Sequence, residues 1–304
     1  MSRIAVVGGI NMDLHLFGGR RRSSGAALVV DHYFTEPGGK GGNVARAAAR
    51  LGAEVRLVAR VGDDEFGHRC VDAIAGDGVD VSAVTFSTTT PTGFVAIELN
   101  HGLHRTLVFA PGANDELAWE HVEPTLQELT TDEIVVAQAE IPGVVMSALA
   151  RHVSSSGVRL FLDPTPPEDV DGAAMRAADV ITPDRAEAAA LVGRTDTSEL
   201  WPLLAAAELH DAGARTVVVK LGATGAVLVD GWRSRQIPTL PIEPIDETGA
   251  GDVFMAALAV RRGEGAGWDD AVRFANVAAA LSVASQGLLL PDRATVEAAL
   301  ADAG

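Results

Sequence analysis

Residues 246–252 read Asp-Glu-Thr-Gly-Ala-Gly-Asp and run directly into an apolar stretch. The small residues Gly249, Ala250 and Gly251 would let successive backbone N–H groups point at one spot, on the positive end of a helix dipole. Such a set of amides is an anion hole, which suits the charge on a transferring phosphoryl group. Asp252 then lies in the first helical turn, where it either takes a proton from an attacking hydroxyl or merely complements the dipole.

A second glycine-rich stretch, Gly38-Gly39-Lys40-Gly41-Gly42-Asn43, precedes the helical residues 44–51. Glycines at this density let the backbone approach a ligand closely and expose N–H groups at a helix N-terminus, while Lys40 and Asn43 add polar contacts. The spacing is neither that of a P-loop nor the G-x-G-x-x-G pattern of dinucleotide-binding folds. Taken alone, a glycine-rich helix start is structural about as often as it is functional.

Short apolar strands alternate with alanine-rich helices along most of the remaining chain. The predicted strands are residues 4–8, 55–61, 134–137, 160–162, 180–181, 216–220 and 226–229. The predicted helices are residues 43–51, 65–75, 144–153, 250–260, 269–284 and 293–301. This alternation is typical of an α/β fold with a doubly wound, mostly parallel central sheet and helices on both of its faces.

Two segments break this alternation. Residues 14–35 have no helical period, and the segments 92–99 and 103–109 alternate around the turn 100–102, which is typical of a β-hairpin. We expect insertions at approximately residues 13–36 and 91–110 to form one small β-sheet lid within a single domain spanning residues 1–304. Such a lid would lie over the carboxyl edge of the central sheet, where open α/β folds place their ligands.

The composition narrows the kinds of partner and compartment. The formal net charge is −17, and Lys40 and Lys220 are the only lysines, so we expect no nucleic-acid partner. Cys70 is alone, which excludes an internal disulfide and fits a reducing cytoplasm. The N-terminus has no signal-peptide pattern, and no apolar run approaches the roughly 20 residues that span a bilayer. We therefore predict a cytoplasmic protein with no membrane partner.

The two glycine-rich stretches resemble the two signatures of the ribokinase, or PfkB, family of carbohydrate kinases, whose patterns are G-G-x-x-x-N and D-T-x-G-A-G-D. Shorter matches lie between and around them in the family's order. They are Asn11-Met12-Asp13, Val61-Gly62-Asp63-Asp64, Thr92-Gly93, Gly112-Ala113-Asn114, Glu140-Ile141-Pro142, Ile181-Thr182-Pro183 and Leu221-Gly222. The resemblance covers roughly residues 4–300 and implies a ribokinase-like fold.

The resemblance implies a sugar site and a catalytic base. The matching sugar-binding positions are Asn11, Asp13, Gly39, Lys40, Gly41, Gly42, Asn43 and Glu140, together with the catalytic Asp252, whose neighbours Gly249, Ala250 and Gly251 form the anion hole. Asparagine and carboxylate groups of this kind can bracket neighbouring sugar hydroxyls, and a site that pairs each hydroxyl rejects ligands that lack one. The structural alternatives are a turn cap for Asp13 and a helix N-terminal carboxylate for Glu140.

The resemblance also implies an ATP site with Mg²⁺. Residues 182–187 are similar to the family's N-x-x-E motif, with Asp184 in place of the asparagine and Glu187 unchanged, and a plain first-turn acid pair is the alternative. Lys220 departs from the family's T-L-G-x-x-G, so its ammonium either reaches a phosphate or points to solvent. The expected nucleotide-binding residues are Asp184, Lys220, Leu221, Gly222, Gly225, Gly251 and Asn276, of which Asn276 would border the adenine or face solvent.

Ribokinases bind K⁺ beside the anion hole, and the matching positions here are Asp246, Thr248, Ser282, Ser285 and Gly287. The loop 287–291 is shorter than the family pattern, which leaves the sixth ligand open. In the family the lids of two subunits clasp each other. Val95, Ile97 and Leu99 alternate with Phe94, Ala96 and Glu98 and give one hairpin face an apolar row too long for a small lid to bury alone, so we expect a homodimer through the lids.

The activity implied by the resemblance is ATP-dependent phosphorylation of the terminal hydroxymethyl of a sugar, with D-ribose as the first expectation and D-ribose 5-phosphate as its product. Other acceptors remain open, because kinases of fructose, 2-keto-3-deoxygluconate and nucleosides share both signatures. A sugar-sensing protein that has lost catalysis is the alternative outside enzymes. The intact Asp252 and anion hole argue against it.

Overall fold

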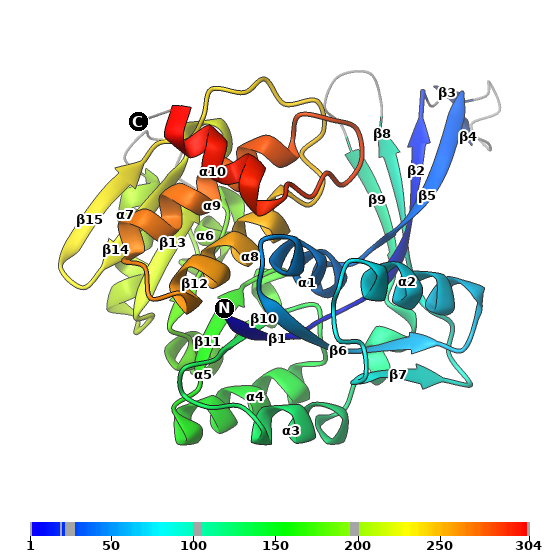
Figure 1. Ribbon diagram of the computed structural model, residues 1–304, viewed down its shortest axis with the longest axis horizontal. Coiled ribbons are helices and arrows are strands. Elements are labelled where there is room, and N and C mark those ends of the chain that lie inside the picture. The colour runs from blue at the N-terminus through cyan, green and yellow to red at the C-terminus, as the bar shows by residue number, and fades with distance from the viewer. Residues whose placement is uncertain (1, 19, 22–27, 100–104, 195–200, 303–304) are drawn as a thin grey trace.

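The computed structural model of the chain describes residues 2–18, 20–21, 28–99, 105–194 and 201–302 (Figure 1). Within those residues the largest feature is a nine-stranded sheet in the order β15-β14-β13-β12-β11-β10-β1-β6-β7. Its strands are β1 (Arg3–Val7), β6 (Glu54–Gly62), β7 (Val84–Ser87), β10 (Ile134–Gln138), β11 (Arg159–Asp163), β12 (Val180–Ile181), β13 (Thr216–Lys220), β14 (Ala226–Asp230) and β15 (Arg233–Ile237). The strands from β7 to β13 pair in parallel, and β14 and β15 continue the sheet antiparallel.

The strand order reverses between β1 and β10. The chain runs outward from β1 through β6 to β7, and it returns to the other side of β1 with β10. Loops that leave the carboxyl ends of two such strands diverge, which opens a crevice where α/β sheets bind ligands. The polar residues Asn11 and Glu140 follow β1 and β10 in sequence, so they flank this crevice.

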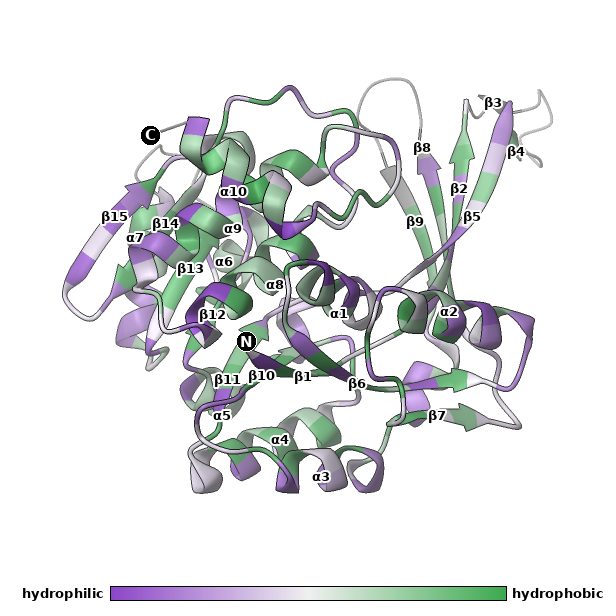
Figure 2. Cartoon of the chain, in the orientation of Figure 1, coloured by the Kyte–Doolittle hydropathy of each residue, from purple (hydrophilic) through white to green (hydrophobic). Residues whose placement is uncertain are grey.

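Helices cover both faces of the sheet, each over its own apolar cluster (Figure 1). One face carries α1 (Lys40–Arg50), α2 (Glu65–Gly76), α8 (Ala250–Gly263), α9 (Trp268–Ser282) and α10 (Arg293–Asp302). The other carries α3 (Trp119–Gln127), α4 (Gly143–Ser156), α5 (Gly172–Ala177), α6 (Arg185–Leu191) and α7 (Trp201–Asp211). Figure 2 shows hydrophobic residues along strands such as β10 and β13, as expected for strands covered on both faces. The predicted doubly wound α/β fold is confirmed.

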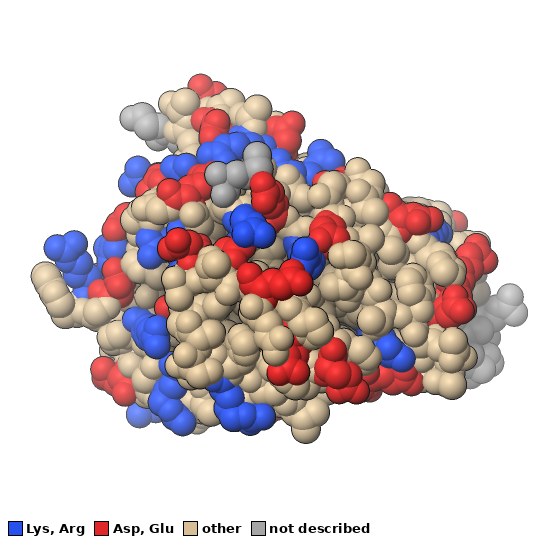
Figure 3. Space-filling model, turned by 60° about the horizontal axis from the view of Figure 1, so that its bottom comes forward, with Lys and Arg blue, Asp and Glu red and all other residues tan. Residues whose placement is uncertain are grey.

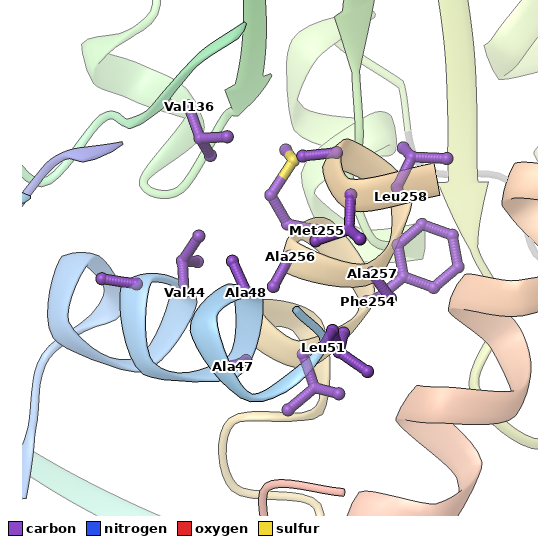
Figure 4. Packing of buried hydrophobic residues seen from close by; sticks show 14 of the residues in the cluster. Val44, Ala47, Ala48, Leu51, Val136, Phe254, Met255, Ala256, Ala257 and Leu258 are labelled. Atoms are coloured by element: carbon purple, nitrogen blue, oxygen red, sulfur yellow. The ribbon is translucent and has the colours of Figure 1, made fainter. Parts of the chain in front are cut away.

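Helix α8 is buried on nearly every side, because residues 252–260 are all buried. Figure 4 shows Ala48 of α1 lying toward Ala256 of α8, with Val136 of β10 on the sheet side. Small side chains at this contact let the two helix backbones approach closely. The packing therefore holds the N-termini of α1 and α8, where both glycine-rich stretches lie, beside each other.

A second, smaller sheet stands beside the central one and has the order β5-β2-β8-β9 (Figure 1). Its strands are β2 (Asn11–Phe17), β5 (His32–Gly38), β8 (Gly93–Leu99) and β9 (Arg105–Ala110), and the short strands β3 (Arg20–Arg21) and β4 (Leu28–Val29) pair with each other. The predicted small lid sheet and the antiparallel β8–β9 pairing are confirmed. The predicted turn at 100–102 lies outside the described residues.

The apolar row expected on β8 differs from the prediction. Ile97 is only 4% exposed within the single chain, because β2 lies beside β8 and places His15 next to it. The side chain of Leu99 lies outside the described part. Large exposed apolar side chains are instead found on β9, where Leu107 and Phe109 share the face of Ile97. The exposed apolar side chains of the lid are thus found on the edge strand β9 rather than on β8.

Charged side chains of both signs are interspersed over the face shown in Figure 3. No helix in the described residues combines the length and the apolar character needed to cross a membrane.

Candidate active site

The glycine-rich stretch 38–43 begins α1, and its backbone takes a conformation that favours glycine. Gly39 is the residue before the helix and has a φ of 85°, and a Cβ there would lie 2.6 Å from the backbone nitrogen of Asn11. Gly41 packs against the backbone of Gly8 in the same way, because a Cβ on Gly41 would lie 2.6 Å from the carbonyl carbon of Gly8. The glycines therefore bring the start of α1 against the loop after β1. This contact puts Lys40 and Asn43 beside Asn11.

Asn114, from the 3₁₀ turn Gly112–Glu116, fixes the orientation of Asn11. Its amide nitrogen donates to Asn11 Oδ1 at 2.8 Å, and its own Oδ1 accepts from the backbone N–H of Ile10 at 3.0 Å. The bond from Asn114 fixes which end of the Asn11 amide is the acceptor. The sequence offered Asn114 only as part of a family match, so its positioning role emerges from the structure.

Asp252 lies at the meeting point of α1 and α8. It is 4% exposed, its Oδ2 accepts from Asn43 Nδ2 at 2.8 Å, and its Oδ1 lies 3.9 Å from Lys40 Nζ. Oδ1 is buried and has no hydrogen-bond partner within the protein. Burial raises the pKa of Asp252, although Lys40 and Asn43 oppose the rise. A buried carboxylate with one unpaired oxygen and a raised pKa has the properties of a general base.

Asp13 and Glu140 approach the same centre from β2 and from the loop after β10. Burial raises the pKa of Asp13 to about 7, with His15 opposing the shift, and raises that of Glu140 to about 7, with Lys40 opposing it. Asp252 contributes to both shifts, and Asp13 Oδ1 is buried without a partner. Crowded carboxylates of this kind are costly in the free protein. They are ready to accept hydrogen bonds from a polyol.

Lys40 supplies the positive charge between these acids. Burial lowers the pKa of its ammonium, but Asp252, Asp163 and Glu140 outweigh that effect and raise it. Lys40 therefore stays charged at any physiological pH. Its position between the sugar-side acids and the α8 N-terminus suits it to both halves of the site.

The glycine-rich stretch 249–251 lies at the start of α8, where the sequence predicts an amide cluster. Gly249 precedes the helix with a φ of 73°, and Ala250, Gly251 and Asp252 occupy its first turn. The N–H of Ala250 donates to the carbonyl of Glu247 at 3.3 Å, and the N–H groups of Gly251 and Asp252 follow it at the positive end of the helix dipole. Glu247 departs from the threonine of the family pattern. The neighbouring Thr248 instead donates its hydroxyl to Asp246 Oδ1 at 2.7 Å.

A cavity of about 370 Å³ opens on the other side of Asp252. Its lining includes Lys40, Asp184, Glu187, Lys220, Gly222, Gly225, Gly249, Ala250, Gly251, Asp252 and Asn276. The expected nucleotide residues are therefore gathered in one place, apart from Leu221, which packs against the apolar cluster of the second face. The volume is in the range of small-molecule sites.

Lys220 points into this cavity rather than to open solvent. Its side chain is 14% exposed and its Nζ lies 3.3 Å from Asp163 Oδ2, and a Cβ on Gly251 would lie 3.3 Å from the same nitrogen. Both lysines of the chain therefore line one cavity, on either side of Asp252. Asp163 ends β11 and is 1% exposed, and no sequence motif singled it out.

Asp184 and Glu187 form the helix cap that was the structural alternative for this motif. Asp184 Oδ1 accepts from the N–H of Glu187 at 2.8 Å, and Glu187 Oε2 accepts from the N–H of Asp184 at 2.6 Å. The hydroxyl of Thr165 donates to Glu187 Oε1. Burial raises the pKa of Glu187, with Lys220 opposing the rise. The two acids stand at the cavity wall with much of their hydrogen-bonding capacity used.

Asn276 is buried rather than facing solvent. It is 4% exposed, and its amide nitrogen donates to the carbonyl of Ile237 at 2.9 Å and to that of Pro238 at 3.2 Å. These bonds join α9 to the end of β15. Asn276 shapes the cavity wall and holds the loop that follows β15.

Three of the positions expected to hold K⁺, Asp246, Thr248 and Gly287, are joined by hydrogen bonds just before α8. Asp246 Oδ1 accepts from the N–H of Thr248 at 2.9 Å, and Oδ2 accepts from the N–H of Gly287 at 3.1 Å. The hydroxyl of Ser282 donates to the carbonyl of Ala279 at 2.8 Å, and Ser285 is half-buried in the same loop. Among the described residues, no three His, Cys, Asp or Glu side chains are grouped as metal ligands. Any cation here would depend largely on backbone carbonyls.

Gln138 is a further polar residue that the sequence analysis missed. It ends β10, is fully buried, and neither of its amide atoms has a partner within the protein. A Cβ on Gly8 would lie 2.1 Å from its Oε1. The residue is embedded in an apolar strand, and no spacing in the sequence distinguishes it from its neighbours.

Comparison with known proteins gives one consistent result. The family model for pfkB family carbohydrate kinases matches residues 1–294. Over 299 residues the chain is 34% identical to the ribokinase of Bacillus subtilis strain 168, which covers 98% of this chain and 99% of that one. The structure is similar to Arabidopsis thaliana ribokinase complexed with ribose and ATP, with a TM-score of 0.86 and 30% identity over 99% of both chains. It is also similar to Escherichia coli phosphofructokinase-2 in complex with potassium, with a TM-score of 0.83 and 25% identity over 99% of both chains.

Proposed function

This chain belongs to the PfkB family of carbohydrate kinases, and from that premise we propose that it transfers the γ-phosphoryl group of ATP to the terminal hydroxymethyl of D-ribose. The single observation that carries the proposal is the position of Asp252. Its buried Oδ1 lacks a hydrogen-bond partner within the protein and lies between a cluster of sugar-type ligands and a cavity that carries the anion hole.

Asp252 accepts the proton of the attacking hydroxyl. The hydroxyl oxygen forms the new bond to the γ-phosphorus while the bond to the β-phosphate oxygen breaks, and ADP leaves with that electron pair. Charge on the transferring group is stabilised by the amides of Ala250, Gly251 and Asp252 and by Lys40. Asn11, Asp13, Asn43 and Glu140 hold the remaining sugar hydroxyls. Gly39, Gly41 and Gly42 allow the backbone to approach the sugar.

Lys220 is proposed to bind the phosphates from the opposite wall. The support is its distance of 3.3 Å from Asp163 and its place beside Gly251 at the anion hole. Asp163, Asp184 and Glu187 would otherwise repel a triphosphate, and one ammonium among them offsets part of that charge. Nucleotide contacts are completed by Leu221, Gly222, Gly225 and Asn276.

Two cations belong to the proposal. Asp184 and Glu187 fit Mg²⁺ through its bound water, because their oxygens are hard ligands at the phosphate wall although each carboxylate already caps α6. Mg²⁺ would supply charge neutralisation of the phosphates. Asp246 and Thr248, with Ser282 at the end of α9 and the carbonyls of Ser285 and Gly287 in the loop that follows, offer the oxygen-only surroundings that suit K⁺. Potassium would stiffen the turn that precedes α8.

We also propose a homodimer through the lids and a cytoplasmic location. Leu107 is 61% exposed and Phe109 is 47% exposed on the same face of the edge strand β9, so a second copy would remove a considerable apolar area from water. ATP is the donor, and the thiol of Cys70 is free and buried, which suits a reducing, ATP-rich compartment.

A coupled assay for ADP formation across pentoses, hexoses, 2-keto-3-deoxy acids and nucleosides tests the acceptor. D-ribose should give the highest kcat/KM, and ADP formation without acceptor should be slow. A higher kcat/KM for fructose, a ketodeoxy acid or a nucleoside would replace ribose as the substrate. Binding of ribose without any turnover would favour a sensor.

A further inference from the structure

The inner face of the lid carries a carboxylate that has no part in the mechanism above. Glu36 on β5 lies directly opposite Asp13 on β2 in the strand pairing. Two like charges opposite each other destabilise a sheet. A side chain in such a place therefore needs other partners, and the structure supplies two of them.

The first partner is His15, a fully buried residue of β2. Its Nε2 lies 2.9 Å from Glu36 Oε1, and its ring stacks on Phe34 with centroids 4.6 Å apart. Phe17 and His32 extend this stack of rings along the lid. Packed rings of this kind leave the imidazole little freedom, so Glu36 lies against a rigid part of the lid.

The second partner is the loop that follows α9. Glu36 Oε1 accepts from the backbone N–H of Leu288 at 3.3 Å, and a Cβ on Gly287 would lie 3.3 Å from the same oxygen. Gly287 has a φ of 73° and donates its N–H to Asp246. The loop is thus fastened to the lid at one end and to the anion-hole turn at the other.

The side chain of Leu288 completes the connection. A Cβ on Gly249 would lie 2.3 Å from Leu288 Cδ1, so the leucine packs directly on the residue that begins α8. A continuous set of contacts therefore runs from Asp13 at the sugar site through Glu36 and Leu288 to Gly249 at the anion hole. Each contact joins groups that are buried or half-buried.

We propose that Glu36 and His15 are positioning residues that couple closure of the lid over the sugar to the conformation of the anion hole. The inference rests on the proposed function. Sugar bound by Asp13 holds the lid down, Glu36 then holds the loop at Leu288, and Leu288 holds Gly249 so that the first amides of α8 face the phosphate. A sugar and a nucleotide that each favour this closed arrangement increase one another's affinity by the same factor.

The test is isothermal titration calorimetry on the full chain, with D-ribose and a non-hydrolysable ATP analogue titrated alone and in each other's presence. In the wild type, each ligand should tighten the other by about 5-fold or more, within the usual range of coupling between sites. In Glu36→Ala that factor should fall to near one, while each ligand alone keeps its affinity within about 3-fold. Glu36→Gln should retain part of the coupling, because its amide oxygen can still accept from Leu288 and its amide nitrogen can face His15.

His32→Asn is the matched control, since it removes a ring from the same stack without touching the loop at Leu288. It should keep the wild-type coupling. Leu288→Ala removes the contact with Gly249, so the coupling between the two ligands should also be lost. This variant replaces Glu36→Ala in the test if Glu36→Ala does not fold. Wild-type coupling in both of these variants would overturn the proposal, as would an active wild type in which the two ligands bind independently. A wild type that phosphorylates no sugar would instead overturn the proposed function.

Discussion

The two sides of Asp252 are built on different principles. On the sugar side, Asn11 and Asn43 are oriented by direct hydrogen bonds, and Asp13 and Glu140 carry buried carboxyl groups with pKa values of about 7. On the nucleotide side, Asp184 and Glu187 cap α6, and Lys220 forms an ion pair with Asp163 at the cavity wall. A small polyol needs fixed polar groups at each hydroxyl, whereas a triphosphate needs compensating charge. The sugar side should therefore respond to loss of single hydrogen-bonding groups and the nucleotide side to changes in charge.

The largest effect is expected at the group that the two sides share. Asp252→Asn keeps the shape and the contact with Asn43 but cannot accept a proton, so kcat should fall by about 10² to 10⁴-fold. Calorimetry should still detect sugar binding. Turnover close to that of the wild type would show that another group takes the proton, and loss of folding would be detected by circular dichroism.

Substitutions of Lys220 should affect the kinetic constants for ATP but not those for the sugar. Lys220→Met removes the ammonium and should lower kcat/KM for ATP by about 10- to 100-fold, the range expected for a lost hydrogen bond to a charged group. The KM for the sugar should change little. Lys220→Arg keeps the charge and should lose less. Equal losses for ATP and sugar would mean that the two sides do not work separately.

The pH dependence should be concentrated on the sugar side. Asp13 and Glu140 accept hydrogen bonds as carboxylates, so the KM for the sugar should rise as pH falls through about 7, their pKa in the folded protein. Folding raises both pKa values, so the protonated forms favour the native state. That contribution is complete below about pH 4 and is lost as pH rises through about 7.

Glu140→Gln therefore gives a second measurement of the same effect. The variant should be more stable than the wild type at pH 8, with a Tm higher by about 2–4 °C for each kcal/mol gained, and should show little gain at pH 4. Sugar affinity should fall at pH 8 at the same time. A Tm difference that does not change between pH 4 and pH 8 would contradict the raised pKa of Glu140.

The smallest effect on turnover is expected from the lid edge. Leu107→Glu with Phe109→Glu should give a folded monomer in sedimentation, with a higher KM for the sugar and only a modest change in kcat. Val108→Glu is the control, because Val108 is 63% exposed on the opposite face of the same strand and should leave a dimer. A wild type that sediments as a monomer at micromolar concentration would contradict the proposed homodimer through the lids.

Much of the fold was predictable because its elements have strong local patterns. The apolar strands of a sheet covered on both faces and the alanine-rich helices appear directly in the sequence, and the glycine-rich stretches indicate close approaches at Gly39 and Gly249. The residues expected at the sugar and nucleotide sites are brought together around Asp252, although their roles stay predictions. Asp64, quoted only as a family match, caps α2 and accepts from Thr92, so it joins that helix to the root of the lid.

What could not be predicted depends on neighbours distant in sequence. Asp163 and Gln138 end buried strands, and only the folded structure places Asp163 3.3 Å from Lys220 of the cavity wall and Gln138 against Gly8 after β1. The burial of Ile97 depends on the parallel pairing of β2 with β8, two strands that lie far apart in the sequence. The contact of Glu36 with Leu288 likewise joins segments 252 residues apart. No local period carries such information.

The central claim is that a ribose hydroxymethyl receives the phosphoryl group with Asp252 as base. The most direct measurement is ³¹P and ¹³C nuclear magnetic resonance of the product formed from ATP and ¹³C-labelled D-ribose by the wild type and by Asp252→Asn. The wild type should give one phosphate ester coupled to C5, in amounts equal to the ADP formed, and the variant should give almost none. Free phosphate in place of the ester, an ester at another carbon, or equal product from the variant would contradict the claim.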